Sequence, residues 1–263
     1  MTGKKDAQQM LEQFFGGEVN YFYQHFAEYD PDRKINITLS DSIFDAAMSM
    51  DLPIKQQEIL RLQGKDVTDS LNGSVVLCKD MDRDGIQIIF SRRAFEYDDG
   101  VTLLGTINHE YTHANDFFDF ARYLGTSDSD EIISNEYWRT LGLWSEFHAR
   151  RNGFRRVLGA ATGEKYAFPP DYMENEIQLL KERWQKSYLQ DELYELMQMC
   201  GRYSVLEELD PGALSGFDVD MLQGFYSGMK RFVAGKIYRF CMLHTDFDSF
   251  IKDADVFRLL VSA

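Results

Sequence analysis

The sequence predicts an α+β fold that is mostly α-helical, and three observations lead to this prediction. Apolar residues recur at helical spacing over much of the chain. Two short runs rich in β-branched and aromatic residues, 74–79 and 86–91, lie close together around a turn-rich connector. The chain has 263 residues, of which 44% are hydrophobic, so it is long enough for one large domain or two small ones with a substantial core.

The first hundred residues are expected to form helices followed by a hairpin. Apolar spacing predicts helices over residues 5–28, 41–50 and 55–63. The two β-rich runs are expected to pair as an antiparallel hairpin, because only the connector Asp80–Gly85 separates them. The expected sheet is therefore small and antiparallel.

The rest of the chain is expected to be helical. Long helices are predicted over residues 101–124 and 132–157, and further helical segments over 171–199 and 203–263. The segment Gly159–Pro170 contains glycine, alanine, threonine and a Pro-Pro pair, which favours a linker. We therefore predict one domain over residues 1–170 and a helical C-terminal region over 171–263 that packs on it.

Charge and cysteine content exclude several classes of function. The formal net charge of −15 opposes binding to nucleic acid or to an acidic membrane surface. We expect no membrane span, because the chain lacks a run of about 18 apolar residues. No secretory leader is expected either, because the charged start is not followed by an apolar stretch.

The three cysteines, Cys78, Cys200 and Cys241, are scattered and odd in number, which favours buried thiols in a reducing cytoplasm.

Residues 109–113 read His-Glu-Tyr-Thr-His, which is the His-Glu-x-x-His pattern. Histidines four residues apart lie on one face of a helix, so both rings can reach one cation about 2 Å from each nitrogen. Glu110 then points beside the metal, where it can take a proton from a metal-bound water and pass it to a leaving amine. The metal makes this chemistry available at neutral pH, because it lowers the pKa of water from about 15.7 to about 7.

The surroundings of this motif favour a functional interpretation. It lies inside the predicted helix 101–124, whose apolar flanks indicate a packed and rigid site. The strand 86–91 precedes it, and an extended substrate is expected to pair with that strand through backbone hydrogen bonds. The alternative is that His109 and His113 are polar members of a buried helix, with Glu110 as a stray surface charge.

A catalytic zinc needs a third protein ligand, and two aspartates after the motif are weak candidates. Asp119 has the spacing of the metzincin ligand, but that pattern needs glycine where this chain has Asp116, so the helix is expected to continue and turn Asp119 away. Asp128 follows Gly-Thr-Ser, which resembles the Gly-Thr-x-Asp part of the aspzincin signature, although the Tyr-Gly that completes that signature is missing.

Glu136 and Glu146 both lie on the predicted helix 132–157, which is the gluzincin arrangement. Apolar periodicity slightly favours Glu136. The local sequence Glu146-Phe-His-Ala149 resembles the Glu-x-x-Ala helix of small bacterial zinc peptidases, including the phage-immunity and radiation-response regulators. This resemblance covers residues 74–156 and implies a zincin-like core in which Glu146 is the third ligand. His148 points to another helix face, where it is a candidate hydrogen-bond donor to an oxyanion.

We therefore expect a Zn²⁺-dependent metallopeptidase that cleaves a peptide or protein substrate, with His109, His113 and Glu146 as metal ligands and Glu110 as general base. Fe, Co or Mn would suit the same ligands. Two alternatives remain. One is a non-catalytic interaction protein whose metal is structural, with His148 or Asp128 as a fourth ligand. The other, motivated by the resemblance, is a regulatory protease that acts on one specific protein partner.

Overall fold

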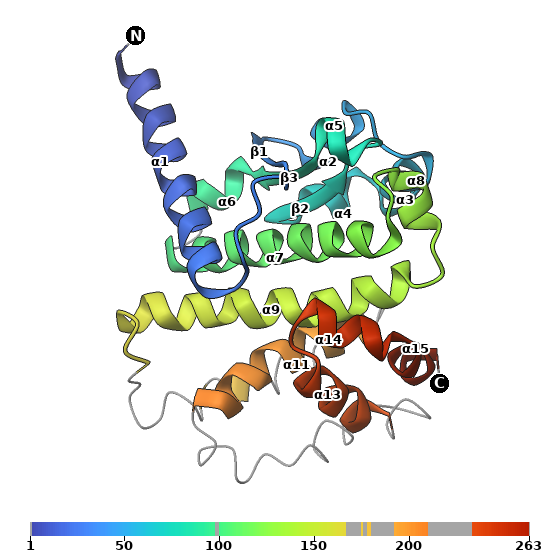
Figure 1. Cartoon of the computed structure of the whole chain (residues 1–263). Coiled ribbons are helices and arrows are strands. Elements are labelled where there is room, and N and C mark those ends of the chain that lie inside the picture. The colour runs from blue at the N-terminus through green and yellow to red at the C-terminus, as the bar shows by residue number, and fades with distance from the viewer. Residues whose placement is uncertain are drawn as a thin grey trace. The chain divides into compact units, whose positions relative to one another are not determined.

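A computed structural model of the chain describes residues 2–97, 100–166, 175, 178–179, 192–209 and 233–262. They belong to two compact units, Met1–Ile133 and Ser134–Ala263, and each unit is described below by itself (Figure 1). The predicted class, α+β and mostly helical, is confirmed. The units divide the chain before the second long helix rather than at residue 170, so that helix belongs with the C-terminal helices.

The sheet of the first unit has three strands among the described residues: β1 (Ile35–Ser40), β2 (Gly73–Leu77) and β3 (Ile86–Ser91). Their order is β1-β3-β2. The predicted hairpin is confirmed, because β2 pairs antiparallel with β3. The expectation of a purely antiparallel sheet was wrong, because β1 pairs parallel with β3 and was not predicted. A parallel pair needs a long connection, and the helices between β1 and β2 supply it.

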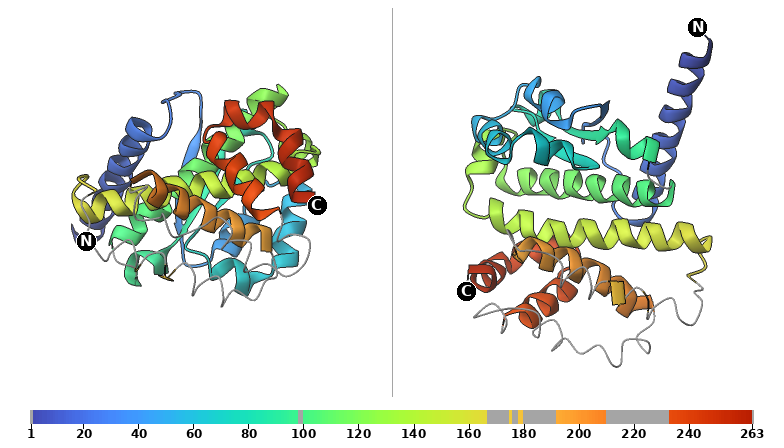
Figure 2. Two further views of the ribbon diagram at one scale, coloured as in Figure 1. Left: turned by 90° about the horizontal axis from the view of Figure 1, so that it is seen from below. Right: turned by 180° about the vertical axis from the view of Figure 1, so that it is seen from behind.

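Helices cover both faces of this sheet. The helices of the first unit are α1 (Thr2–His25), α2 (Ile43–Met48), α3 (Ile54–Gln63), α4 (Lys65–Asp69), α5 (Met81–Asp84), α6 (Arg92–Tyr97), α7 (Gly100–Leu124) and α8 (Ser129–Ser134). On one face, Val76 and Ile89 join a buried cluster with residues of α2 and α3. On the other face α7 packs against β2 and β3, as Figure 2 shows. Side chains alternate along a strand, so Gly73 and Val75 of β2 face α7.

The regular elements in the described part of the second unit are all helices. Its longer helices are α9 (Trp138–Thr162), α11 (Glu192–Leu209), α13 (Ala234–Leu243), α14 (Phe247–Lys252) and α15 (Ala254–Ser262). The indole of Trp144 is fully buried and stacks on Phe250 with ring centroids 4.5 Å apart. Helices α9 and α11 approach closely at Gly201, where a Cβ atom would lie 2.7 Å from the carbonyl oxygen of Phe147.

The single helix predicted over 132–157 was wrong, because the chain turns between α8 and α9. The Asn135 side chain accepts a hydrogen bond of 2.9 Å from the Tyr137 amide, and the Asn135 carbonyl accepts one of 3.1 Å from Trp138. Such a local bond competes with the helix and ends it. At the other end, α9 extends to Thr162 and takes up the start of the predicted linker 159–170. Residues 167–170, most of 171–191 and all of 210–232 lie outside the described residues.

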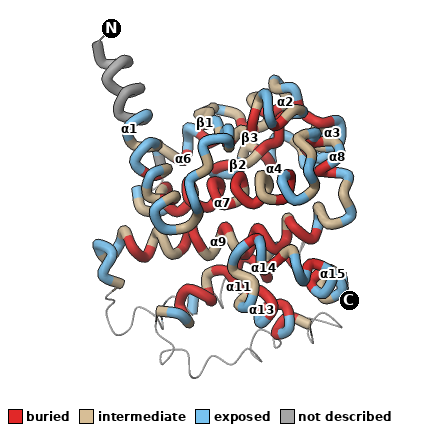
Figure 3. Tube along the Cα trace, viewed as in Figure 1, coloured by how far each residue is buried: buried red, intermediate tan, exposed pale blue. Residues whose placement is uncertain are grey.

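Helices α7 and α9 are buried along much of their length (Figure 3). The thiols of Cys78, Cys200 and Cys241 are buried and free, as expected. Within the part of the chain that the structure describes, no helix is both long enough and apolar enough to cross a membrane.

Candidate metal centre

Helix α7 brings the two histidines of the motif together. Their Nε2 atoms lie 3.1 Å apart and the two rings are nearly perpendicular, at 88°. Two nitrogens that bind one zinc ion tetrahedrally at 2.0–2.1 Å would lie about 3.3 Å apart. The spacing of His109 and His113 therefore fits two ligands of one ion, and a proton shared between the rings would also suit it. The His113 ring stacks on Phe117, which limits its rotation.

Glu110 lies on the sheet side of α7. Its side chain is 8% exposed and packs against Gly73 of β2. A Cβ atom at Gly73 would lie 2.9 Å from Cγ and 3.1 Å from Oε1 of Glu110. The carboxylate is thus buried beside the sheet, which contradicts the alternative of a stray surface charge.

Strand β3 cannot accept a further strand, because both of its edges are paired. The expectation that a substrate would lie along residues 86–91 was therefore wrong. Strand β2 is at the edge of the sheet. Hydrogen bonds from the Ser91 amide to the Asn72 carbonyl (2.9 Å) and from the Cys78 amide to the Gly85 carbonyl (3.4 Å) fix its register.

In this register the odd-numbered residues of β2 point their amide and carbonyl groups outward. The Leu77 amide donates to Oε1 of Gln56 at 3.1 Å. The backbone groups of Gly73 and Val75 have no backbone partner on that edge among the described residues. The open part of the edge therefore begins at the residue against which Glu110 packs.

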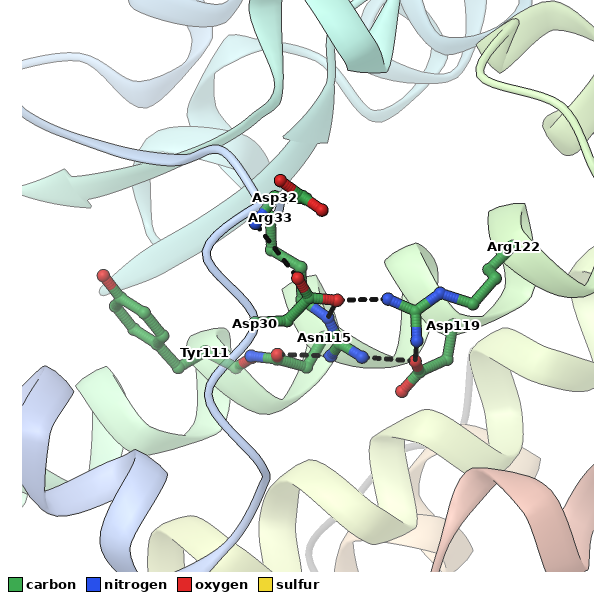
Figure 4. A network of polar contacts seen from close by, with 7 residues as sticks. All are labelled: Asp30, Asp32, Arg33, Tyr111, Asn115, Asp119 and Arg122. Carbon is green, nitrogen blue, oxygen red and sulfur yellow. Dashed lines mark hydrogen bonds and ion pairs between the residues drawn. The ribbon is translucent and has the colours of Figure 1, made fainter.

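A polar network anchors α7 just beyond the histidines in sequence, at Asn115 and Asp119, and Figure 4 shows the side chains of this network. Arg33, 10% exposed, donates to Oδ1 of Asn115 at 2.6 Å and to Oδ1 of Asp119 at 2.5 Å. The Asn115 amide donates to the Tyr111 carbonyl at 2.8 Å. Arg122 pairs with Asp30 at the edge of the network. The loop before β1 is thereby tied to the helix that carries the motif.

Asp119, one of the weak candidates for the third ligand, belongs to this network. Burial raises the pKa of its carboxyl group, and the guanidinium of Arg33 offsets part of that rise. Asp128 is also engaged in local structure, since its Oδ1 accepts a hydrogen bond of 2.9 Å from the Asp130 amide. Both aspartates therefore have structural roles in the first unit.

The candidates on the predicted second helix lie in the second unit. Glu136 lies in the turn before α9, where its side chain is 67% exposed and pairs with Arg258. Glu146 lies on α9, is 2% exposed, and is 3.6 Å from Nη2 of Arg150. His148 contacts the Asn152 side chain at 3.2 Å and packs on Trp144. Of the two glutamates, only Glu146 is buried.

Imidazole nitrogens and a carboxylate oxygen are ligands that zinc accepts. His109 and His113 of the first unit and Glu146 of the second are side chains that could hold a metal ion, and no other set of three or more such side chains is found among the described residues.

Comparison with known proteins identified no matching family model, no similar curated sequence and no similar solved structure.

Proposed function

We propose that this chain is a zinc-dependent metallopeptidase in which His109, His113 and Glu146 hold the metal. The observation that carries the proposal is the pair of imidazole Nε2 atoms 3.1 Å apart on α7, next to a buried glutamate. Glu146 is proposed as the third ligand rather than Glu136, because Glu146 is buried. Glu136 is exposed and forms an ion pair with Arg258. A bound zinc ion would supply an acidified water and a Lewis acid for the peptide carbonyl.

Glu110 is the general base in this proposal. Its carboxylate accepts a proton from the attacking water and later donates it to the leaving amine. Burial beside β2 restricts its rotation and keeps bulk water from competing for that proton. The neighbouring ligands His109 and His113 remain neutral to bind the metal, so they take no part in proton transfer.

The substrate in this proposal is a peptide or protein segment in extended form. It pairs with the outer edge of β2 at Gly73 and Val75, which is the edge next to Glu110. The strongly negative net charge makes nucleic acid a poor alternative substrate. The free, buried cysteines support a cytoplasmic protein.

The metal ligands are tested by metal analysis of purified protein after loading with zinc. Wild type is expected to retain one ion per chain, whereas His113→Ala and Glu146→Ala lose it. Glu136→Ala is the matched control, because it removes a carboxylate from the same part of the chain and is expected to retain the ion. Equal loss in Glu136→Ala, or full retention in Glu146→Ala, would contradict the assignment of the third ligand.

The general base is tested with Glu110→Gln, which preserves the shape of the side chain. This variant is expected to retain zinc and to lose turnover by at least about 100-fold. Turnover is measured on labelled casein and, in parallel, on proteins encoded beside this chain. Retained hydrolysis would refute the role of Glu110. A wild-type protein that holds zinc and cleaves none of these substrates would instead favour a structural metal.

A further inference from the structure

Gly73 occupies a position in β2 where a Cβ atom would come too close to Glu110 and Phe90. A Cβ atom there would meet Cγ of Glu110 at 2.9 Å, Cδ1 of Phe90 at 3.0 Å and Oε1 of Glu110 at 3.1 Å. Real Cβ atoms essentially never approach another atom as closely as 2.9 Å, and the other two contacts are tight, so at least one neighbour has to move. Phe90 is fully buried in the sheet and packs against Phe15 and Phe95, which makes Glu110 the side chain that yields.

The backbone conformation does not explain this glycine. Gly73 is not among the glycines with positive φ, such as Gly64 or Gly85. It lies in a regular strand, opposite Phe90 in the antiparallel register. Glycine weakens a strand, and inside one it often marks a close approach of another group. Here that group is the carboxylate of Glu110.

We propose that Gly73 is a positioning residue for Glu110. By lacking a side chain, it lets the carboxylate lie against the edge strand at the point where the backbone of β2 has no strand partner among the described residues. The catalytic part of this inference rests on the proposed function. The packing part does not, because it concerns only the contact between Gly73 and Glu110.

The packing is tested by a thermal double-mutant cycle that needs neither metal nor substrate. Gly73→Ala is expected to lower the unfolding midpoint of metal-free protein by about 4 °C, which is typical of mild overpacking. In a Glu110→Ala background most of this loss disappears, because Cγ and Oε1 are gone. In a Glu110→Gln background the loss persists, because the shape is unchanged. Gly16→Ala is the control, since a Cβ atom there meets nothing within 4 Å.

The positioning is tested by the kinetics of zinc-loaded Gly73→Ala on a quenched fluorogenic peptide that wild type cleaves. We expect kcat to fall by about 10- to 100-fold, because a displaced base loses its alignment. KM stays within about twofold and the zinc content is unchanged. A merely structural defect would lower the fraction of active protein without changing the pH profile, whereas a displaced Glu110 shifts the acidic limb of kcat/KM.

Equal thermal losses in the Glu110→Ala and wild-type backgrounds would overturn the inference, as would an unchanged kcat in Gly73→Ala. Failure of the proposed function has a different signature. In that case wild type itself cleaves nothing, while the thermal cycle still decides whether Gly73 sets the place of Glu110.

Discussion

Helices α7 and α9 are both 25 residues long, and each carries part of the proposed metal site, yet different interactions hold them in their units. Helix α7 has the sheet on one side and is tied by charged hydrogen bonds through Arg33 to Asn115 and Asp119. Helix α9 depends on aromatic packing at Trp144 and on close contact with α11 at Gly201.

The two kinds of interaction differ in whether they mainly fix the orientation of a helix or mainly add free energy of unfolding. Hydrogen bonds to charged groups have narrow geometric requirements, so the Arg33 network fixes the angle of the helix just beyond His113. Apolar packing contributes more free energy of unfolding but tolerates small shifts better. We therefore expect changes in the second unit to affect stability most, and changes around Arg33 to affect the histidine site at a smaller cost in stability.

The largest effect is expected from Trp144→Ala. The indole is fully buried, stacks on Phe250 and donates a hydrogen bond of 2.7 Å to the His244 carbonyl. Its removal should lower the free energy of unfolding by about 3–5 kcal/mol, measured by urea denaturation. Hydrogen exchange should rise in α9 and α11 before it rises in β2 and β3. Equal loss of protection in both units would contradict the expectation that this substitution acts mainly on the second unit.

A smaller effect is expected from Arg33→Met, which keeps the aliphatic stem and removes the hydrogen bonds. Asp119 and Asn115 then lose the hydrogen bonds from the Arg33 guanidinium, at a cost of about 2–3 kcal/mol. Arg122→Met is the matched control, because its side chain is 64% exposed and such pairs contribute under about 1 kcal/mol. If both variants lose the same stability in urea, the network has no special role.

The smallest effect is expected from Glu208→Gln in the second unit. Burial raises the pKa of Glu208, but the guanidinium groups of Arg155 and Arg151 outweigh it, so the pKa is lowered overall. Because its pKa is lowered in the folded state, the ionised carboxylate stabilises the fold at pH values above the ordinary carboxyl pKa of about 4.3. This stabilisation is lost as the pH falls through the lowered pKa of the folded state. Because Glu208 is half-exposed, the loss at pH 7 should stay under about 1 kcal/mol.

The measurement for Glu208→Gln is the unfolding midpoint of both proteins between pH 7 and pH 3. The two curves should differ at pH 7 and converge in acid, where the wild-type carboxylate is protonated. A gap that stays constant over this range would show that the carboxylate contributes no charge-dependent stability.

Much of the fold could be predicted from hydrophobic spacing alone. The helix over 101–124 and the hairpin were found because their patterns are long or closely spaced. Strand β1 was missed, although Ile35, Ile37 and Leu39 alternate, because its partner β3 is distant in sequence and local pattern carries no pairing information. The break at Asn135 was missed because apolar periodicity continues through it, whereas the asparagine side chain decides the turn.

Sequence was likewise sufficient to predict one part of the candidate site and insufficient for the rest. The histidine pair follows from a spacing of four residues on one helix, so sequence was sufficient for it. The choice between Glu136 and Glu146 depends on burial and on Arg258, which is 122 residues from Glu136, so sequence spacing left it open. Gly73 gave no sequence signal, because its importance lies in the contact with Glu110.

The three buried thiols can report, through their reaction with an alkylating reagent, on the opening of the structure around them. Cys78 belongs to the first unit, and Cys200 and Cys241 belong to the second. Burial raises the pKa of all three, so an alkylating reagent reacts only when the surrounding structure opens. Mass spectrometry of the labelled peptides would thus time the opening of each unit separately in a single sample, without any introduced probe.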